Sequence, residues 1–424
     1  MKQLKIGEEM FNLNVDLDEE LARCFGCKNK PCQSRCPLGN DVTGFIELVK
    51  AEKYEDAFEL LTKTSVLPSI CSRVCPHMKQ CQSNCTAAFK GKTINIGLVE
   101  SFLGDLAIEN DWHFSRISDD LVGKKIAIIG AGPAGLTAAA YLARFGASVT
   151  IFEKHEKLGG ILMYGIPTFR LDKNILDKAI SKILELGIEV KVKCELEKDI
   201  FLKDLKRDFD VVFLGFGANV SNKMRIPGED LNGVFGGNEL LEYANHPTYD
   251  GKNIFVCGGG NVAMDSARTI KRLGANKVTV VYRRSVEEMP AEKKEIAEAK
   301  AEGIEFLFHT NLIEVLGDDS VKEIKCIKTA YEGNKLVNVS DTEFIFDADY
   351  VVMAIGSSTN VDVLSDLGLE LNERGYIKVD ENYQTSDKKV FAAGDLIGEK
   401  STVAWASRSG RNAANAIKNF LREG

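Results

Sequence analysis

The sequence predicts an α/β fold in which a small helical domain precedes two domains built on parallel sheets, the second inserted in the first. Two observations predict the sheets. The apolar runs Lys125–Ile129 and Asn253–Cys257 each open onto a glycine-rich turn, and strand and helix patterns alternate from residue 123 onward. A third observation predicts the helical domain, because eight cysteines and four of the nine prolines fall within residues 1–120. We expect its helices at Asp41–Lys53 and Tyr54–Thr62.

The charge and hydropathy of the chain exclude some classes of partner. The net charge of −8 argues against a nucleic-acid or anionic-membrane partner, which would favour a basic surface. The longest apolar stretch, Ile126–Ala143, approaches the length of a membrane span, but glycines and a proline interrupt it where a strand must turn into a helix. We therefore expect no transmembrane segment and a cytoplasmic protein.

The clustered cysteines form two quartets, and each quartet contains a Cys-Pro pair. Disulfides are disfavoured, because Met1–Asn14 lacks the apolar core of a signal peptide and disulfide-dense chains are usually small and secreted. Structural zinc sites usually show two separated Cys-x2-4-Cys pairs. The Cys-x3-Cys-Pro ending is typical of bacterial ferredoxins, although their middle spacing is x2, so iron–sulfur clusters are favoured over zinc. The spacings are Cys24-x2-Cys27-x4-Cys32-x3-Cys36 and Cys71-x3-Cys75-x4-Cys81-x3-Cys85.

The first glycine-rich turn has the features of a Rossmann-like dinucleotide site. It follows the strand Lys125–Ile129 and begins the helix Ala134–Arg144, and the next strand, Ser148–Phe152, ends on Glu153. Glycine permits the tight turn, the approach of a pyrophosphate and close packing of the helix, while the acid can bind a ribose hydroxyl pair. The candidate residues are Gly130, Ala131, Gly132, Pro133, Ala134, Gly135 and Glu153.

The second glycine-rich turn repeats this pattern, with a helix at Val262–Leu273 and a strand at Lys277–Tyr282. This strand ends on two arginines rather than on an acid. Arginine can hold a 2′-phosphate by bidentate bonds, so the turn favours NADP over NAD, although a solvated basic pair at a strand end is also common. The candidate residues are Gly258, Gly259, Gly260, Asn261, Val262, Arg283 and Arg284.

Further motifs accompany the cysteine quartets and the two turns. They are Ile96–Glu100, Leu158–Gly160, Gly165–Pro167, Phe169–Leu171, Val281–Arg284, Phe391–Asp395 and Ser401–Val403. In this combination, over essentially its whole length, the chain resembles the small (beta) subunit of NADPH-dependent glutamate synthase. It is also similar to the large subunit of NADH-dependent ferredoxin:NADP oxidoreductase and to the N-terminal part of dihydropyrimidine dehydrogenase.

The resemblance implies a place for each cofactor. Two 4Fe–4S clusters would lie in residues 1–120, FAD in a domain made of 121–235 and 351–424, and NAD(P) in a Rossmann-like domain at 236–350. For FAD, the resemblance implies Glu153 on the ribose, Arg170 near the flavin and Asp395 at the ribityl chain. A helix that begins near Thr402 would point its N-terminus at the pyrimidine ring. The other residues implied are Gly160, Gly394 and Val403 for FAD, and Ala354 and Gly356 on the nicotinamide side of NADP.

For the clusters, the resemblance implies ligands that interleave the two quartets. One set is Cys24, Cys27, Cys32 and Cys85, and the other is Cys36, Cys75, Cys81 and Glu100. Glu100 stands where dihydropyrimidine dehydrogenase carries a glutamine ligand, and Cys71 is left without a metal. The alternative is two clusters of four sequential cysteines, with Cys71 as a ligand and Glu100 as a solvated helix residue.

Hydride chemistry moves electrons in pairs whereas clusters take them singly, so a flavin between them is the natural converter. We expect an NAD(P)H-dependent oxidoreductase that passes electrons between NADPH and a partner subunit through FAD and two clusters, without a side-chain acid or base. The partner would be a glutamate synthase large subunit. In a ferredoxin-dependent NADP transhydrogenase, with or without electron bifurcation, it would be a flavin and iron–sulfur subunit. The sequence is also compatible with a diaphorase that acts alone, and with a sensor protein that binds zinc and NADP.

A few residues outside these motifs also carry expectations. Cys194, Cys257 and Cys326 are expected as buried core thiols, and His77 as a surface residue. No Cys-x-x-Cys follows the second glycine-rich turn, which disfavours a thioredoxin reductase.

Overall fold

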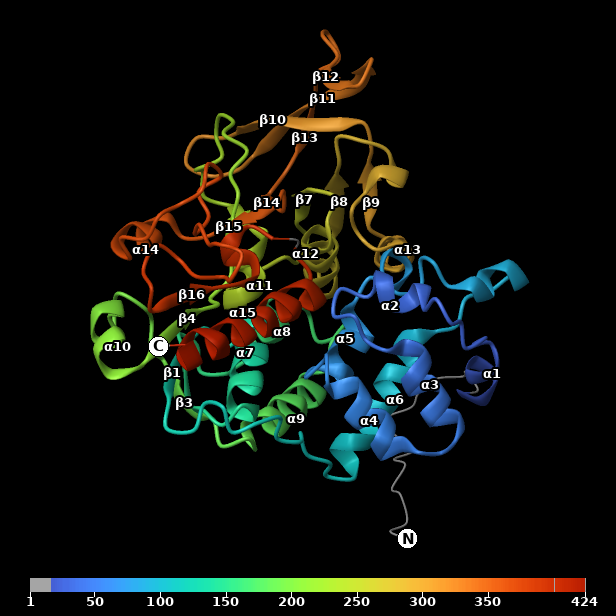
Figure 1. Cartoon of the computed structure of the whole chain (residues 1–424). Coiled ribbons are helices and arrows are strands. Elements are labelled where there is room, and N and C mark those ends of the chain that lie inside the picture. Colours follow the sequence, from blue (N-terminus) through green and yellow to red (C-terminus); the bar gives the residue numbers. More distant parts are fainter. Residues whose placement is uncertain (1–16, 400, 424) are drawn as a thin grey trace. The chain divides into compact units, whose positions relative to one another are not determined.

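The computed structural model describes residues 17–399 and 401–423 and divides into two compact units (Figure 1). The first unit comprises Met1–Met163, Thr168–Gly217 and Val361–Gly424, and the second comprises Tyr164–Pro167 and Ala218–Asn360. The second unit is therefore inserted in the sequence of the first. The expectation about a signal peptide concerns Met1–Asn14, which lies outside the described residues.

The N-terminal part of the first unit is helical, as the sequence predicts. Its elements are α1 (Leu17–Ala22), α2 (Pro31–Arg35), α3 (Val42–Lys50), α4 (Tyr54–Thr62), α5 (Pro68–Val74), η1 (His77–Lys79), η2 (Thr86–Lys90) and α6 (Ile96–Glu109). Asp41 and Asn95 begin α3 and α6, because their side chains accept backbone N–H groups at 3.0 and 3.1 Å. The predicted helix from residue 41 ends early, since Glu52 adopts a φ of 57° just beyond it.

A five-stranded parallel sheet forms the centre of the rest of the first unit. Its strand order is β16-β4-β1-β2-β3, so the predicted strands at residues 125 and 148 are neighbours and a strand near residue 390 closes one edge. The strands are β1 (Lys125–Ile129), β2 (Ser148–Glu153), β3 (Glu189–Val192), β4 (Val211–Leu214) and β16 (Val390–Ala392). The helices are α7 (Pro133–Arg144), α8 (Ile161–Tyr164), α9 (Lys173–Leu184), α10 (Leu202–Asp208), α14 (Val361–Asp366), η4 (Gly394–Ile397) and α15 (Val403–Glu423).

Helix α15 lies directly on α7, the helix that follows the first glycine-rich turn (Figure 1). A Cβ atom added to Gly410 would lie 2.2 Å from the carbonyl oxygen of Ala134, so only glycine allows this approach. Two segments about 270 residues apart in the sequence are thereby packed backbone to backbone around the same turn.

The second unit holds another five-stranded parallel sheet, with the order β6-β14-β7-β8-β9. The predicted strands at residues 253 and 277 are β7 and β8, which pair in parallel. The strands of this sheet are β6 (Val234–Gly236), β7 (Asn253–Cys257), β8 (Lys277–Val281), β9 (Glu305–Leu307) and β14 (Tyr350–Met353). An antiparallel sheet of β10 (Thr310–Leu316), β11 (Glu323–Glu332), β12 (Lys335–Asn338) and β13 (Phe344–Asp347) adjoins it, and β5 (Val220–Ser221) pairs with β15 (Ser357–Ser358).

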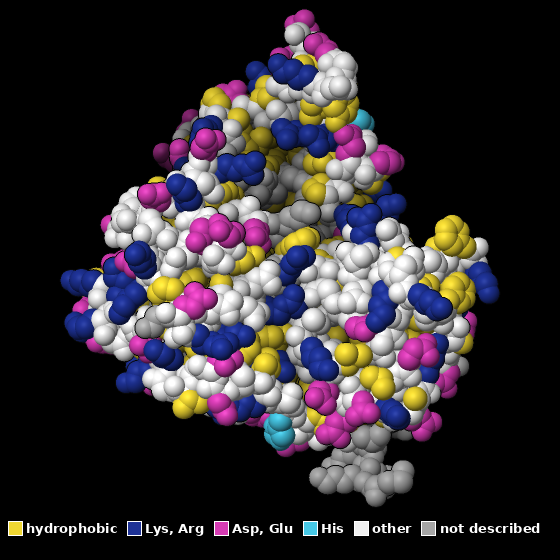
Figure 2. All heavy atoms as spheres, viewed as in Figure 1, with side chains coloured by type: hydrophobic (Ala, Val, Ile, Leu, Met, Phe, Trp, Pro, Cys, Tyr) yellow, Lys and Arg dark blue, Asp and Glu magenta, His cyan; other side chains and the backbone are white. Residues whose placement is uncertain are grey.

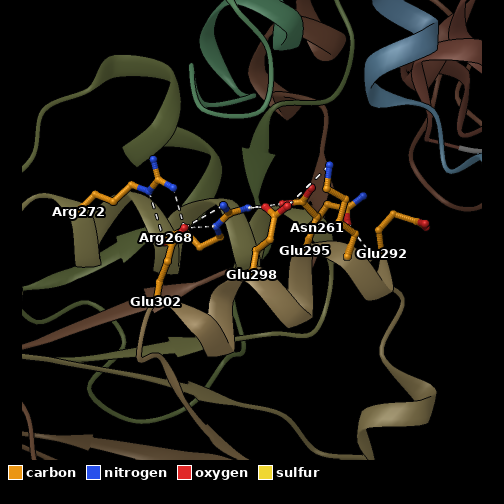
Figure 3. Close-up of polar contacts among 8 residues, drawn as sticks. Asn261, Arg268, Arg272, Glu292, Glu295, Glu298 and Glu302 are labelled. Atoms are coloured by element: carbon orange, nitrogen blue, oxygen red, sulfur yellow. Dashed lines mark hydrogen bonds and ion pairs between the residues drawn. The ribbon is translucent and has the colours of Figure 1, made fainter. Parts of the chain in front are cut away.

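A buried ion cluster holds two helices of the second unit together (Figure 3). The helices of this unit are α11 (Gly237–Tyr243), α12 (Asn261–Arg272), η3 (Val286–Glu288) and α13 (Lys293–Ala301). The Arg268 guanidinium on α12 binds Glu295, Glu298 and Glu302 at 2.5, 2.8 and 2.9 Å. Because a buried guanidinium is stable only with such partners, α13 is fixed beside the helix that starts at the second glycine-rich turn.

None of the described helices combines the length and the apolar character that crossing a bilayer requires. Figure 2 shows Lys and Arg side chains interspersed with Asp and Glu over the visible face.

Candidate functional site

The first group of cysteines lines one pocket in the helical part of the first unit. Cys24, Cys27, Cys32 and Cys85 border it, together with side chains of α3. The Cys27 Sγ lies 3.0 Å from the Thr86 hydroxyl oxygen. Burial and, to a smaller extent, the charges of the nearby Cys24 and Cys85 thiols raise the pKa of the Cys32 thiol to about 11. The structure therefore brings Cys85, from the second sequence quartet, to three cysteines of the first.

The second group gathers around a glutamate on α6. Burial raises the pKa of Cys36 to about 11 and also raises that of Cys81, and in both cases the Glu100 carboxylate adds to the effect. A hydrogen bond between Cys75 and Cys71 and burial raise the pKa of Cys75, and the charges of Cys71 and Glu100 contribute in the same direction. Cys36, Cys75, Cys81 and Glu100 thus lie together, as the interleaved arrangement requires.

Glu100 is buried, which contradicts the alternative that it is a solvated helix residue. Burial raises the pKa of its carboxyl to about 8, and a hydrogen bond from Asn40 Nδ2 to Oε1, at 3.3 Å, opposes this rise. The thiols of Cys36, Cys75 and Cys81 lie close to the Glu100 carboxyl, and the negative charges of their deprotonated forms repel one another. A bound cation would lower the four raised pKa values, so this set of donor atoms fits a metal centre.

The remaining clustered cysteine and the spacing of the thiols bear on the kind of metal. Cys71 is buried beside Cys75, to which it is hydrogen-bonded. Among the described residues, the trio of ligand atoms within 4.8 Å of one another belongs to the exposed Asp111, His113 and Glu185, and no cysteine is part of such a trio. Sulfurs around one tetrahedral zinc ion are about 3.8 Å apart. The described cysteine sulfurs therefore lack the close spacing of ligands around a single zinc ion.

The first glycine-rich turn has the geometry of a dinucleotide cradle. Gly130 has a φ of 93°, and a Cβ on Gly135 would lie 1.9 Å from the Gly130 carbonyl oxygen. A Cβ on Gly132 would meet nothing nearer than 3.9 Å, so the turn is open at this position. The Glu153 Oε2 accepts the N–H of Ala131 at 2.8 Å, which places the strand-end acid against the turn. Pro133 and Ala134 begin α7, whose N-terminus favours an anion.

Two glycines and an aspartate from later in the chain complete this cradle. A Cβ on Gly160 would lie 2.9 Å from the Gly132 Cα, and one on Gly394, 3.0 Å from the Ala134 Cβ. Asp395 follows immediately, and its buried Oδ1 has no hydrogen-bond partner among the described atoms. Burial raises the pKa of this carboxyl to about 6, although a hydrogen bond with the Ser401 side chain opposes the rise. A buried acceptor of this kind fits a hydroxyl group of a bound cofactor.

The start of α15 contacts Gln80, which directly precedes Cys81 of the second cysteine group. Thr402 precedes α15, which begins at Val403, and its hydroxyl oxygen accepts from the Trp405 N–H at 3.4 Å and from Gln80 Nε2 at 3.5 Å. Gln80 lies between two cysteines of the second group. Arg170 is half-buried in the segment before α9.

The second glycine-rich turn forms a similar cradle in the second unit. A Cβ on Gly258 would lie 2.1 Å from the carbonyl oxygen of Ala354, and one on Gly259 would lie 2.4 Å from the Tyr282 ring. Around Gly260 nothing lies within 4 Å of such an atom, so the turn is open where α12 begins at Asn261 and Val262. Gly356, with a φ of 115°, lies beyond Ala354 on the same edge.

The two arginines after β8 have a fixed backbone. The Arg283 carbonyl accepts from the Thr329 hydroxyl at 2.6 Å, and the Arg284 carbonyl accepts from the His309 N–H at 3.2 Å. Arg283 is exposed, whereas the Nε of the half-buried Arg284 is shielded and has no hydrogen-bond partner among the described atoms. An anion would satisfy this donor.

Two expectations about single residues were wrong. His77 is half-buried rather than on the surface, because its ring lies against Gly97 on α6, and burial lowers its pKa to about 4. Cys257 and Cys326 are buried as expected, but Cys194 is partly exposed at the end of β3. Sequence patterns gave no signal for Asn40, the partner of Glu100, because no spacing relates it to a cysteine motif.

Two family models cover most of the chain. Residues 124–419 match the pyridine nucleotide-disulphide oxidoreductase model, and residues 7–112 match dihydropyrimidine dehydrogenase domain II, a 4Fe–4S cluster domain. The fold and these matches define a pyridine nucleotide oxidoreductase with an N-terminal 4Fe–4S domain. The predictions of an α/β fold and of an NAD(P)H-dependent flavin and iron–sulfur oxidoreductase are thereby confirmed.

Similar proteins of known name narrow this class. The glutamate synthase [NADPH] small chain of Escherichia coli is 36% identical over 94% of this chain and 90% of its own length. The NADP(+)-dependent formate dehydrogenase subunit beta of Moorella thermoacetica is 35% identical, over 93% of this chain and 60% of its own length. The chain belongs to the family of the glutamate synthase small chains.

Solved structures show the likeness of fold alone. Mycobacterium tuberculosis FprA in complex with NADPH matches with a TM-score of 0.62 and 18% identity, over 70% of this chain and 84% of its own. The thioredoxin reductase of T. acidophilum matches with a TM-score of 0.54 and 23% identity, over 70% of this chain and 98% of its own.

Proposed function

We propose that this protein passes electrons between NADPH and a partner subunit, using FAD and two 4Fe–4S clusters. The observation that carries the proposal is that seven cysteines and Glu100 lie in two groups. Gln80, which directly precedes Cys81 of the second group, contacts Thr402 at the start of α15. Bound FAD would connect the two-electron transfer of a hydride to the one-electron transfers of the clusters. The protein's own task is to hold the cofactors and to keep water from them.

Each cluster is assigned one group of ligands. Cys24, Cys27, Cys32 and Cys85 would hold the first cluster, which borders the pocket, and Cys36, Cys75, Cys81 and Glu100 would hold the buried second one. The raised pKa of Glu100 and the mutual repulsion of this group support the assignment, since ligands in such a set must be deprotonated by the metal. Cys71 is assigned no metal.

FAD is assigned to the cradle of the first unit. Gly130, Gly132 and Gly135 would receive the pyrophosphate, Glu153 the ribose, and Asp395 the ribityl hydroxyls. The open position at Gly132 and the partnerless Oδ1 of Asp395 support this assignment. FAD would be bound by residues 121–163, 168–217 and 361–424 of the first unit, because residues 164–167, 218–235 and 351–360 of the expected domain belong to the second unit. Arg170, Gly160, Gly394 and the start of α15 at Thr402 and Val403 would complete the site.

NADP is assigned to the cradle of the second unit, in a domain at 218–360 that extends the expected 236–350, because β6 and β14 belong to its sheet. The open position at Gly260 would receive the pyrophosphate, and Arg283 and Arg284 the 2′-phosphate, with Ala354 and Gly356 on the nicotinamide side. The shielded, partnerless Nε of Arg284 supports a phosphate there.

The partner is assigned from the relatives, which are named as a small chain and as a subunit beta. We therefore propose a separate large subunit of the glutamate synthase type as the electron acceptor or donor. A cytoplasmic location is proposed too, since free thiols and thiolate-bound clusters suit a reducing compartment.

Anaerobic addition of NADPH to the purified protein tests the proposed function. The flavin absorbance should bleach within seconds, and NADH should act more slowly. Iron and sulfide should each reach about eight per chain. A flavin band that NADPH leaves unchanged would rule out the proposal, and zinc in place of iron would point to the zinc-binding sensor.

A further inference from the structure

The C-terminal end of α4 is bound by side chains from the FAD-binding part of the first unit. The carbonyl oxygens of residues 62, 63 and 64 accept, each at 2.8 Å, from Arg144 Nη1, the Tyr141 hydroxyl and Arg411 Nη1. The last carbonyls of a helix lack partners within it and favour positive charge nearby. Here α7 and α15, the helices that line the FAD cradle, supply those partners.

Arg411 binds a second loop with the same nitrogen. Its Nη1 also donates to the Leu38 carbonyl at 2.8 Å. One side chain of α15 therefore fixes residues 38–40 against residues 62–64. The side chains of these two loops meet as well, because the Thr64 hydroxyl donates to Asn40 Oδ1 at 2.7 Å.

This hydroxyl determines how the Asn40 amide is turned. An amide whose oxygen is occupied by a donor must present its NH2 group elsewhere, and Asn40 presents it to Glu100 Oε1 at 3.3 Å. Asn40 and Glu100 are both buried, so water does not compete for these bonds. An unbroken set of contacts thus runs from α15 through Arg411, Thr64 and Asn40 to Glu100.

We propose that Asn40 and Thr64 are positioning residues that orient the Glu100 carboxylate toward the second cluster, and that Arg411 links this pair to the FAD helices. The proposal rests on the proposed function, in which Glu100 is a cluster ligand. Ligating carboxylates are themselves hydrogen-bonded, and loss of such a partner typically weakens metal binding about 10- to 100-fold.

The Thr64→Val variant tests the pair, because it removes the hydroxyl and keeps the shape. In the reduced protein the EPR signal of the second cluster should shift and its iron should pass to a chelator about tenfold faster, while the first cluster is unchanged. Thr64→Ser should restore both properties. Thr62→Val is the matched control, since the Thr62 hydroxyl donates only to carbonyls of α4 itself, at Phe58 and Glu59. Wild-type EPR and iron release in Thr64→Val would overturn the proposal.

Arg411→Met tests the link to α15, with flavin absorbance as the measure of correct folding. The second EPR signal should shift as in Thr64→Val, and Arg411→Lys, which keeps a charged donor, should recover most of the wild-type signal. Arg422→Met is the control, because Arg422 lies exposed on the same helix. A flavin-loaded Arg411→Met protein with a wild-type second signal would overturn the link.

Glu100→Ala separates the positioning proposal from the ligand assignment beneath it. If Glu100→Ala leaves the second cluster's EPR signal unchanged, Glu100 is no ligand and the assignment fails. If Glu100→Ala changes the signal while Asn40→Ala and Thr64→Val do not, the ligand assignment stands and only the positioning role fails.

Discussion

The backbone N–H of Ala131 donates to Glu153 Oε2 at 2.8 Å, and the other oxygen of this carboxylate accepts from His155 at 3.0 Å. Glu153→Ala should remove the acceptor of the buried Ala131 N–H and of the partly buried His155 N–H, and lower the free energy of unfolding by about 3 kcal/mol. FAD affinity should also fall. Glu153→Gln, which keeps one acceptor oxygen, should lose less stability and less FAD affinity than Glu153→Ala. Denaturant unfolding and FAD titration of the apoprotein check this, and an alanine variant with wild-type stability would contradict it.

Two glycines of the first turn should respond differently to the same change. Gly135→Ala places a methyl group 1.9 Å from the Gly130 carbonyl oxygen, so the turn must distort and stability should fall by several kcal/mol. Gly132→Ala meets nothing within 3.9 Å and should leave the apoprotein stable, yet weaken FAD binding, because the methyl group occupies the phosphate path. Thermal unfolding with and without FAD separates the two effects. Equal FAD affinity in Gly132→Ala and wild type would show that the pyrophosphate does not bind at this position.

The buried carboxyl of Asp395 should make the stability of the apoprotein depend on pH. Burial raises its pKa from 3.8 in the unfolded chain to about 6 in the folded one. As the pH rises between these values, the unfolded state releases the proton first. The free energy of unfolding therefore falls by roughly 3 kcal/mol between about pH 4 and pH 6.

Asp395→Asn should therefore be more stable than the wild-type apoprotein above pH 6 and equal to it near pH 4, but bind FAD more weakly. Urea unfolding of both apoproteins across this pH range measures the difference between their free energies of unfolding. The other acidic residues contribute equally to both proteins and so do not affect this difference. If the stabilities of the two proteins depend on pH in the same way, ionisation of Asp395 does not destabilise the folded apoprotein.

Arg284 should distinguish NADPH from NADH. Arg284→Ala removes a charged donor from the proposed 2′-phosphate site, which should raise KM for NADPH about tenfold or more and leave KM for NADH nearly unchanged. Arg272→Ala, on α12, is the control, since Arg272 is bound to Glu302 at 2.6 Å. Flavin reduction rates with each nucleotide provide the measurement. A change of equal size for both nucleotides would place the 2′-phosphate elsewhere.

Cys71 and Cys75 lie one helical turn apart but should differ in their effect on the clusters. Cys71→Ser should leave both clusters loaded, whereas Cys75→Ser should lose the second cluster and about half of the iron. Iron analysis and EPR on the reduced proteins check both variants. Loss of a cluster from Cys71→Ser would favour the arrangement of four sequential cysteines.

The fold could be predicted where local chemistry leaves few choices. Strand β1 and α7 follow from the glycine turn between them, since Gly130 and Gly135 occupy positions that a side chain cannot. The antiparallel sheet of β10 to β13 was not predicted, because β12 and β13 are short and partly exposed and all four strands lie outside the glycine-turn motifs that identified the parallel strands. The grouping of the cysteines came from resemblance rather than from spacing.

The contacts of Glu100 could not be predicted from the sequence at all. Asn40, Thr64 and Arg411 are single polar residues in unrelated segments, and only the packing of α15 on the helical part brings them together. A hydrogen bond between distant side chains has no period or motif that the sequence could display.

The contact between Gly410 and Ala134 also constrains the order in which the molecule can be assembled during synthesis. Residues 218–360 contain every strand of the second unit and can fold as soon as they leave the ribosome. The sheet that begins at residue 125 must wait for β16 and α15, which are made some 260 residues later. A nascent chain that has emerged from the ribosome as far as residue 360 would therefore contain a complete second unit but an incomplete sheet in the first. The proposed FAD cradle can be completed only after α15 has packed on α7.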